Sequence, residues 1–279
     1  MAQDHDRSDR PRVGLALSGG AARGIAHVGV LRAFEEHAIP VDAIAGASAG
    51  ALIGGAYAAG LSIKQLEELA LKFRWRHMAR LSFSRLGLQS NARMENFLRA
   101  RLPVTRFEEL KIPFAAMVTD LRKGTPLALR DAGDVAFAIR ASCCLPAFHV
   151  PVRDGDGRLL VDGGLVANLP ISYTRDLGAD IVIAVDVGAD GARFMEAPRT
   201  ALGVLTLVFV AVERVVSNQE SKDADLIIIP KVGHIRWDET RRADELLTAG
   251  YDATLESIES IKELIERYAL NQKPSESFV

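Results

Sequence analysis

Short apolar segments of strand character alternate along the chain with longer segments of helical periodicity, and this order constrains the fold most. Several short segments lack a polar residue at every second position, which is typical of strands covered on both faces. Strands are expected at 13–17, 41–45, 114–118, 159–161, 181–187 and 226–229. Helices are expected at 22–37, 49–59, 62–73, 92–101, 134–142, 200–216 and 243–269. Strands that alternate with helices form βαβ units, so the sequence predicts an α/β fold with a mainly parallel sheet.

Composition fits one large folded unit. The chain has 279 residues, of which 48% are hydrophobic and 25% charged, enough apolar material for a large core. We expect a single domain over 12–270 between two tails, 1–11 and 271–279. The formal net charge of −2 excludes the basic footprint of a dedicated nucleic-acid binder. The two cysteines, Cys143 and Cys144, are adjacent and predict no disulfide framework, which favours a reducing cytoplasm.

No membrane-spanning segment is expected. The first ten residues are polar and lack the apolar core of a secretory signal. The longest apolar run, 201–212, is interrupted by Gly203 and Thr206 and is shorter than the roughly 20 residues that cross a bilayer. The sequence therefore predicts a cytoplasmic protein, peripheral at most to the inner face of the membrane.

A G-x-S-x-G motif stands between an apolar strand and a helix of small residues, where Gly46 and Gly50 flank Ser48. A sharp strand-to-helix turn presents such a serine as an exposed nucleophile, and the glycines remove side chains that would collide with neighbouring elements. The alternative is a close-packing turn in which Ser48 only caps the helix. The motif in this setting favours the nucleophile.

A glycine-rich turn after the first strand, Ser18-Gly19-Gly20-Ala21-Ala22-Arg23-Gly24, opens a helix. Such a turn exposes backbone N–H groups, which a hydrolase needs to stabilise an oxyanion. Phosphate binding is the alternative, but the G-K-[ST] of a Walker A loop is absent, and the second strand ends in the serine motif rather than in an acidic residue. Beside Ser48, the turn is the candidate oxyanion hole.

A carboxylate ends a later strand in Val161-Asp162-Gly163-Gly164. Burial raises the proton affinity of a carboxylate, and a direct hydrogen bond can align proton transfer from a serine hydroxyl. Asp162 could therefore act as a base without an imidazole. By itself, Asp-Gly-Gly is more often a turn.

These three features, in this order, resemble the bacterial patatin-like phospholipases. The resemblance covers roughly 12–190 and implies a three-layer α/β/α fold, a Ser48–Asp162 dyad and lipid or lysophospholipid ester hydrolysis without a cofactor. It implies support of the motifs by Gly46, Gly50, Gly163 and Gly164, and an oxyanion hole at Gly19, Gly20, Ala21, Arg23 and Gly24. The family has a third glycine where this chain has Ala21, which would be unfavourable if that position required positive φ. Arg23 would brace the loop or meet a phosphate head group.

Other arrangements stay open. Only His234 follows Asp162, so a triad of Ser48, His234 and Asp162 or Asp186 is an alternative. His27 is expected to pack in a helix and His149 to line a pocket or loop. No metal is expected: Asp154 and Asp156 resemble the start of a calcium loop, but Leu165 replaces its glutamate. An acyltransferase or a non-catalytic lipid-binding adaptor could use the same pocket.

The segment 72–106 is strongly basic, with nine Lys and Arg residues against Glu95 alone. Aromatic and aliphatic residues are interleaved, as in a cap-like amphipathic stretch that contacts an anionic membrane. The alternative is a solvated cap whose arginines pair with acidic residues elsewhere. The oligomeric state is left open by the sequence.

Overall fold

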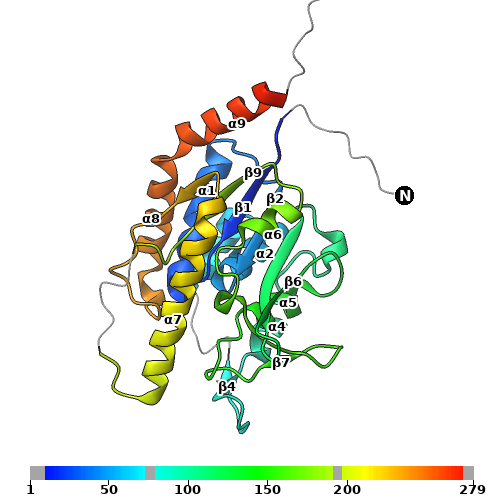
Figure 1. The fold of residues 1–279 in the computed structure, drawn as a ribbon, viewed down its shortest axis with the longest axis vertical. Coiled ribbons are helices and arrows are strands. Elements are labelled where there is room, and N and C mark those ends of the chain that lie inside the picture. The colour runs from blue at the N-terminus through cyan, green and yellow to red at the C-terminus, as the bar shows by residue number, and fades with distance from the viewer. Residues whose placement is uncertain (1–9, 73–78, 191–196, 273–279) are drawn as a thin grey trace, which may run out of the picture.

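The computed structural model describes residues 10–72, 79–190 and 197–272, and its centre is an eight-stranded sheet (Figure 1). The strand order is β10-β9-β1-β2-β5-β8-β7, with β6 paired to β5. These strands are β1 Val13–Leu17, β2 Ala43–Ala47, β5 Phe114–Asp120, β6 Thr125–Leu129, β7 Val152–Arg153, β8 Leu159–Asp162, β9 Ile181–Val185 and β10 Leu226–Ile228. The five strands from β10 to β5 are parallel, and β6, β7 and β8 pair antiparallel at the other side. The sheet is therefore mixed, with its parallel part as predicted.

Helices cover both faces of the sheet, which gives the expected three-layer α/β/α fold. Helices α1, α2 and α5 pack on one face with α8 outside α1, and α6 packs on the other (Figure 1). The helices are α1 Ala26–Glu36, α2 Ala49–Ala58, α3 Ile63–Lys72, α4 Ala92–Arg99, α5 Val135–Ser142, α6 Ile171–Asp176, α7 Ala201–Glu220, α8 Ala243–Leu255 and α9 Ile258–Gln272.

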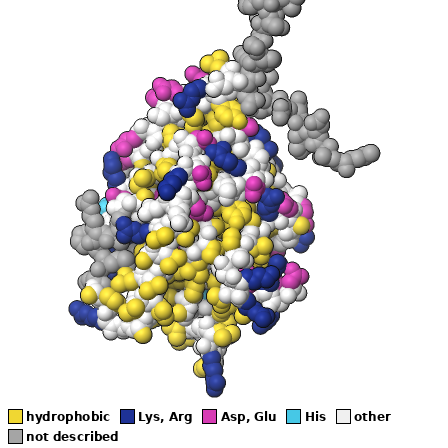
Figure 2. Space-filling view, viewed as in Figure 1, with side chains coloured by type: hydrophobic (Ala, Val, Ile, Leu, Met, Phe, Trp, Pro, Cys, Tyr) yellow, Lys and Arg dark blue, Asp and Glu magenta, His cyan; other side chains and the backbone are white. Residues whose placement is uncertain are grey.

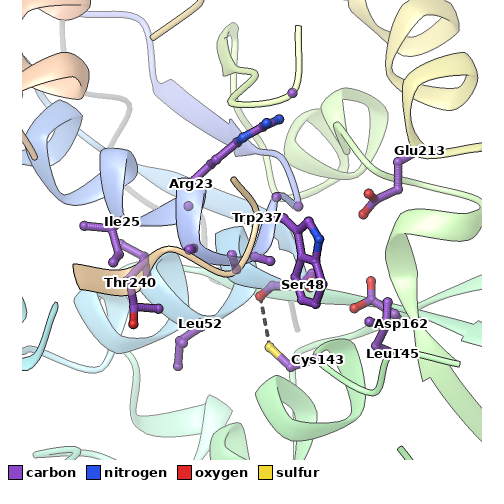
Figure 3. A pocket seen from close by; sticks show the side chains of 18 of the residues that line it. Arg23, Ile25, Ser48, Leu52, Cys143, Leu145, Asp162, Glu213, Trp237 and Thr240 are labelled. Atoms are coloured by element: carbon purple, nitrogen blue, oxygen red, sulfur yellow. Dashed lines mark hydrogen bonds between the residues drawn. The ribbon is translucent and has the colours of Figure 1, made fainter. Parts of the chain in front are cut away.

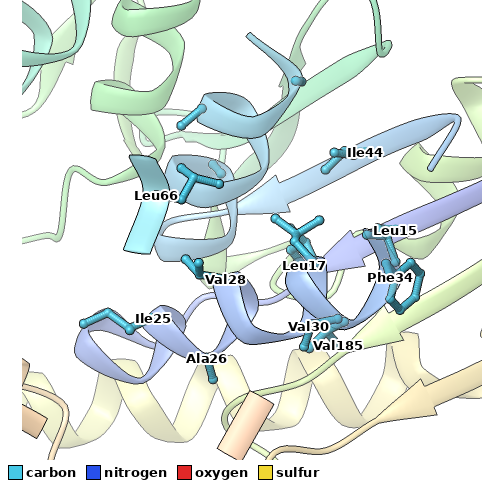
Figure 4. Close-up of a cluster of buried hydrophobic side chains, with 14 of the residues drawn as sticks. Leu15, Leu17, Ile25, Ala26, Val28, Val30, Phe34, Ile44, Leu66 and Val185 are labelled. Atoms are coloured by element: carbon cyan, nitrogen blue, oxygen red, sulfur yellow. The ribbon is translucent and has the colours of Figure 1, made fainter. Parts of the chain in front are cut away.

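The core lies on both sides of the parallel strands. Along β1, Leu15 and Leu17 join the large apolar cluster under α1 and α2, whereas Ala16 joins a smaller cluster under α6 (Figure 4). Successive side chains of a strand point to opposite faces, so a strand covered on both faces has no polar alternation. This explains the uniformly apolar segments of the sequence.

Several element boundaries differ from the sequence predictions. The helix expected over 22–37 begins as a 3-10 helix, Ala21–Ile25, and becomes α1 at Ala26. The helix expected over 243–269 is two helices, because a turn at 256–257 separates the end of α8 at Leu255 from the start of α9 at Ile258. Ile258 and Ile261 are buried in the core, whereas Leu255 at the end of α8 is exposed. Residues 154–157 lie in the turn between β7 and β8, which pair antiparallel.

The length argument against a membrane-spanning helix is wrong for α7. The helix continues past the apolar run 201–212 to Glu220, and the helical segment Ala201–Asp223 is long and apolar enough to cross a bilayer by length and composition. The expected tails also fall mostly outside the described residues, which exclude 1–9 and 273–279. The domain bounds 12–270 stay a prediction.

Candidate active site

Ser48 sits in the strand-turn-helix that its motif predicts, between β2 and α2. Its backbone has φ 50° and ψ −117°, a strained conformation for a residue with a side chain. A Cβ at Gly46 would lie 2.5 Å from the carbonyl carbon of Gly50, and a Cβ at Gly50 would lie 2.2 Å from the Leu17 oxygen. Only glycines therefore let α2 cross β1 and β2 this closely.

The end of α5 fixes the backbone of Ser48. The Ser48 N–H donates to Ser142 Oγ over 2.9 Å, and Cys143 Sγ donates to the Ser48 carbonyl over 3.2 Å (Figure 3). These contacts hold the turn from outside the motif. They leave the Ser48 hydroxyl directed into the cavity that its side chain lines.

The register of the sheet brings Asp162 to the level of Ser48. On β5, Met117 pairs with Ala47 of β2, and the next residue, Val118, pairs with Asp162 of β8. Ser48 follows Ala47, so the serine and the aspartate lie at the same height on either side of β5. A Cβ at Gly163 would come within 2.3 Å of the Met117 oxygen, so the turn that follows Asp162 packs directly against the backbone of β5.

Asp162 is almost wholly buried, with 1% of its surface exposed. Burial raises the pKa of its carboxyl to about 7, against the opposing effects of hydrogen bonds from the Gly164 N–H and the Ser48 side chain. The Gly164 bond to Oδ1 measures 2.9 Å. Thr119 Oγ1 donates to the Asp162 carbonyl over 2.7 Å and holds the backbone. Such a carboxyl can exchange a proton near neutral pH.

The glycine-rich loop lies against the start of α2, where a Cβ at Gly24 would come within 2.3 Å of the Ala49 Cβ. Ala21 has φ 50°, so this position does have the positive φ that is unfavourable for alanine. The Gly19 N–H donates to Asn168 Oδ1 over 3.1 Å, and the Ala22 N–H donates to the Trp237 carbonyl over 2.8 Å.

The amides of Gly20 and Ala21 have no hydrogen-bond partner within residues 10–72, 79–190 and 197–272. Both residues line the cavity that Ser48 and Asp162 also line. Unpartnered backbone donors beside a nucleophile are what a developing oxyanion requires. The substitution of alanine for glycine at position 21 keeps this donor.

Arg23 braces a distant loop. Its side chain is buried, and Nε donates to the Ile235 carbonyl over 2.7 Å. Burial lowers the pKa of the guanidinium, although Asp190 and Glu213 oppose this effect. Of the two roles expected for Arg23, these contacts favour bracing over binding of a head group.

The cavity has a volume of about 380 Å³ and two chemically different ends. One end is apolar and lies between α2, α3 and α4. Its lining includes Leu52, Ile53, Ala56, Leu66, Leu69, Ala70, Met94, Phe97 and Leu98. The other end lies beneath α7 and carries polar side chains that include Asp186, Glu213, Arg214, Ser217 and Asn218. Ser48 and Asp162 line the same cavity.

Glu213 is a second carboxyl group close to Asp162, and the sequence did not predict it. It extends from α7 toward Asp162 (Figure 3), and its Oε1 lies 2.6 Å from where a Cβ of Gly164 would be. Glu213 lines the cavity, and burial together with the charge of Asp162 raises its pKa well above the usual value. Burial and an ionised Asp162 therefore both favour the protonated form of Glu213.

Asn168 also had no assigned role. Its Oδ1 accepts from Gly19, and its Nδ2 donates to Ser217 Oγ over 2.8 Å, which ties the glycine-rich loop to α7. The nearest sequence signal was its place six residues after Asp162. Gly19 and Ser217, the partners of Asn168, are far from it in sequence. Glu213 is likewise far in sequence from Gly19 and Gly164, which it lies beside.

The structure separates His234 from Ser48. His234 is half-exposed and shares a 2.6 Å hydrogen bond with Glu245, and it is not among the residues that line the cavity. The alternative triad through His234 is therefore wrong. His27 is buried in α1 and contacts the Ser18 carbonyl at 2.9 Å, as expected for a packing residue. His149 lines the cavity, and burial lowers its pKa to about 4.

The basic segment 72–106 divides into paired and projecting residues; 73–78 lie outside the described residues. Arg99 pairs with Glu95 and Asp134, and Arg106 pairs with Glu108, as the solvated-cap alternative expected. Arg80 and Arg85 instead lie in an exposed hairpin made of β3 Arg80–Leu81 and β4 Gln89–Ser90. No ion pair forms at these two arginines within the described ranges.

Comparison with known proteins agrees with this geometry. Residues 15–175 match the family model of the patatin-like phospholipases. The chain is 36% identical over 183 residues to lysophospholipase nte1 of Aspergillus fumigatus, which covers 63% of this chain and 12% of that protein. It is 37% identical over 188 residues to an uncharacterized NTE family protein of Mycobacterium tuberculosis, which covers 66% of this chain and 51% of that protein.

Among solved structures, VipD from Legionella pneumophila has a similar fold, with a TM-score of 0.62 at 16% sequence identity. The similarity covers 90% of this chain and 67% of VipD. The chain thus spans about half, or about an eighth, of the curated relatives above. Because the family model covers more than half of the sequence and includes Ser48 and Asp162, the chain belongs to the patatin-like phospholipase family.

Proposed function

We propose that this protein is a serine acyl hydrolase that cleaves the carboxylic ester of a lysophospholipid or a similar single-chain lipid. Ser48 is the nucleophile and Asp162 the general base of a catalytic dyad. The observation that carries the proposal is the contact between a strained, cavity-facing serine and a buried carboxyl whose pKa lies near 7. Its relatives include lysophospholipases by name.

In the first half of the reaction, Ser48 Oγ attacks the acyl carbonyl carbon and its proton passes to the Asp162 carboxylate. The carbonyl oxygen becomes an oxyanion, which accepts hydrogen bonds from the Gly20 and Ala21 amides. Preorganised amides of this kind lower the barrier because they need no rearrangement as charge develops. When the tetrahedral intermediate collapses, the leaving alcohol takes the proton from Asp162 and the acyl group stays on Ser48.

In the second half, water replaces the alcohol and follows the same route in reverse. Asp162 takes a proton from the water as it attacks the acyl carbonyl. The proton then returns to Ser48 Oγ when the carbon–oxygen bond to the serine breaks, and the fatty acid leaves. The cycle needs no metal or organic cofactor, because the base, the nucleophile and the oxyanion donors all come from the chain.

The two ends of the cavity support a substrate with one apolar chain and a polar remainder. The apolar end between α2, α3 and α4 would hold the acyl chain, and the polar end beneath α7 would hold the alcohol part. A cavity of about 380 Å³ with one apolar end favours a single acyl chain over two.

The test is hydrolysis of lysophosphatidylcholine and of p-nitrophenyl esters, with release of free fatty acid measured. We expect Ser48→Ala and Asp162→Asn each to lower kcat/KM by at least ~10³-fold, because nucleophile and base act as one unit. His234→Ala, a half-exposed histidine outside the cavity, is the control and should retain activity.

Other results would contradict the proposal. Loss of activity in His234→Ala but not in Asp162→Asn would restore the histidine triad. Acyl transfer to added glycerol in preference to water would identify an acyltransferase. If the folded protein hydrolysed no ester, the result would favour the alternative of a non-catalytic lipid-binding adaptor.

A further inference from the structure

Helix α7 turns an apolar face outward, unlike an ordinary surface helix. An ordinary surface helix turns its apolar stripe inward. Exposed positions of α7 recur at helical spacing and are mainly apolar over its first four turns: Ala201, Val204, Leu205, Val208, Ala211 and Val215. The opposite face carries the polar residues Thr206, Glu213, Ser217 and Glu220, together with the apolar Phe209 and Val210.

The polar face of α7 is bound to the catalytic loops. Ser217 Oγ accepts from Asn168 Nδ2 over 2.8 Å, and Glu220 Oε2 accepts from the Leu169 N–H over 2.7 Å. Glu213 faces the cavity beside Gly19 and Gly164. The helix is therefore held in place by its polar side, and its apolar side is left without cover over the described residues.

A second apolar element borders the same cavity. The exposed hairpin of β3 and β4 projects Leu81, Phe83, Leu86 and Leu88, of which Phe83 is fully exposed and Leu81 is 81% exposed. Gln89 of the hairpin and Thr206, Phe209 and Val210 of α7 line one cavity, so the two elements stand at its rim together. Figure 2 shows hydrophobic side chains gathered over this end of the molecule, with Lys and Arg side chains at its edges.

The charges of these two elements select the kind of partner. The hairpin residues 79–90 include Arg80 and Arg85 and no acidic residue. On α7, Glu213 and Arg214 both line the cavity, so the arginines of this surface are those of the hairpin. Apolar residues interleaved with arginines fit an anionic lipid surface. A second copy of the chain fits less well, because a two-fold contact would place like charges opposite each other.

We propose that the exposed face of α7 and the hairpin 79–90 together form a surface that docks on an anionic bilayer. The helix lies in the plane of the interface, and the cavity opens toward the lipid. A spanning orientation of α7 would break its bonds to Asn168 and Leu169, so length and hydropathy alone do not place it across the bilayer. The docking surface rests on the same cavity as the proposed function but does not require turnover.

The experiment is co-sedimentation of the full chain with vesicles of phosphatidylglycerol and phosphatidylcholine, and with phosphatidylcholine alone. Leu205→Glu with Val208→Glu changes α7, and Phe83→Ser with Leu86→Ser changes the hairpin; none of these residues lines the cavity. Leu270→Glu is the matched control, since Leu270 is also exposed but lies on α9 at the other end of the molecule (Figure 1).

We expect binding to the mixed vesicles, at least tenfold weaker binding by either double variant, and unchanged binding by Leu270→Glu. Arg80→Glu with Arg85→Glu should remove the preference for anionic vesicles. All variants should hydrolyse a water-soluble p-nitrophenyl ester as the unchanged protein does, which shows that they are folded.

Equal vesicle binding by both double variants would overturn the proposal. So would a dimer in solution that Leu205→Glu with Val208→Glu dissociates, since a second copy would then cover the face. Resistance of the bound protein to alkaline extraction would also overturn it and identify a spanning helix. Ester hydrolysis without vesicle binding would reject the docking surface alone, whereas vesicle binding without hydrolysis would reject the proposed function alone.

Discussion

The chemistry of Asp162 depends on how completely the fold removes it from water. An exposed aspartate is too weak a base for a serine hydroxyl, because water stabilises its ionised form. Burial raises the pKa of Asp162 to about 7, while the Gly164 N–H still orients Oδ1. The carboxyl can therefore be ionised at neutral pH and yet hold the serine proton, as the proposed reaction requires.

The raised pKa of Asp162 predicts the pH dependence of hydrolysis. A general base must be deprotonated to act, so kcat/KM for an uncharged ester should rise with pH up to about 7 and be level above it. The groups that face Asp162 are Ser48, Glu213, Cys143 and Cys144. Steady-state kinetics between about pH 5 and 9 would measure the midpoint.

Glu213→Gln is the matched variant for this profile. Glutamine resembles a protonated glutamic acid, and burial and the Asp162 charge both favour the protonated form of Glu213. The midpoint should therefore stay in place. A midpoint that falls clearly in Glu213→Gln would mean that Glu213 carries a negative charge beside Asp162. A profile with a midpoint near 4 in the unchanged protein would contradict the account of Asp162.

The sequence pointed to Ser48, Asp162 and the glycine-rich loop because each stands in a short motif at the end of a strand. It did not reveal the groups that hold them. Ser142 binds the Ser48 N–H from 94 residues away, and Asn168 binds the Gly19 N–H from 149 residues away. Such contacts depend on how elements pack, and a single sequence contains no local signal for them.

Among the elements, α7 was the least predictable. Its length was underestimated because the apolar run 201–212 ends before the helix does, and the remaining turns carry polar residues that face the catalytic loops. The break between α8 and α9 was missed for a related reason: the apolar periodicity continues across 256–257 although the helix does not. Periodicity shows which face is buried better than it shows where a helix ends.

Helices α2, α3 and α4 are expected to set the acyl-chain preference. Ala70 lines the apolar end of the cavity from α3, so Ala70→Phe should fill part of that end. We expect a loss of about tenfold or more in kcat/KM for long-chain p-nitrophenyl esters, with little loss for the acetate or butyrate.

The control for Ala70→Phe is Ala100→Phe, which adds the same ring at an exposed position beside α4. It should leave the chain-length preference unchanged. A uniform loss over all chain lengths in Ala70→Phe would contradict the assignment of the apolar end to the acyl chain.

For the whole molecule, the sequence predicted the layers but not the order of the strands. Alternating segments indicate βαβ units, and β1, β2 and β5 do follow each other across the sheet. The insertion of β9 beside β1 and the antiparallel pairing of β8 with β5 join residues far apart in sequence. That antiparallel pairing puts Asp162 at the level of Ser48, so the site depends on the part of the topology that the pattern did not show.

The reaction of the protein with a fluorophosphonate probe tests the central claim, that Ser48 is a nucleophile activated by Asp162, most directly. Intact mass and peptide mapping should show one adduct, on Ser48, formed much more slowly in Asp162→Asn and absent in Ser48→Ala. Failure of the folded protein to react, or equal labelling of Ser48→Ala, would contradict the account.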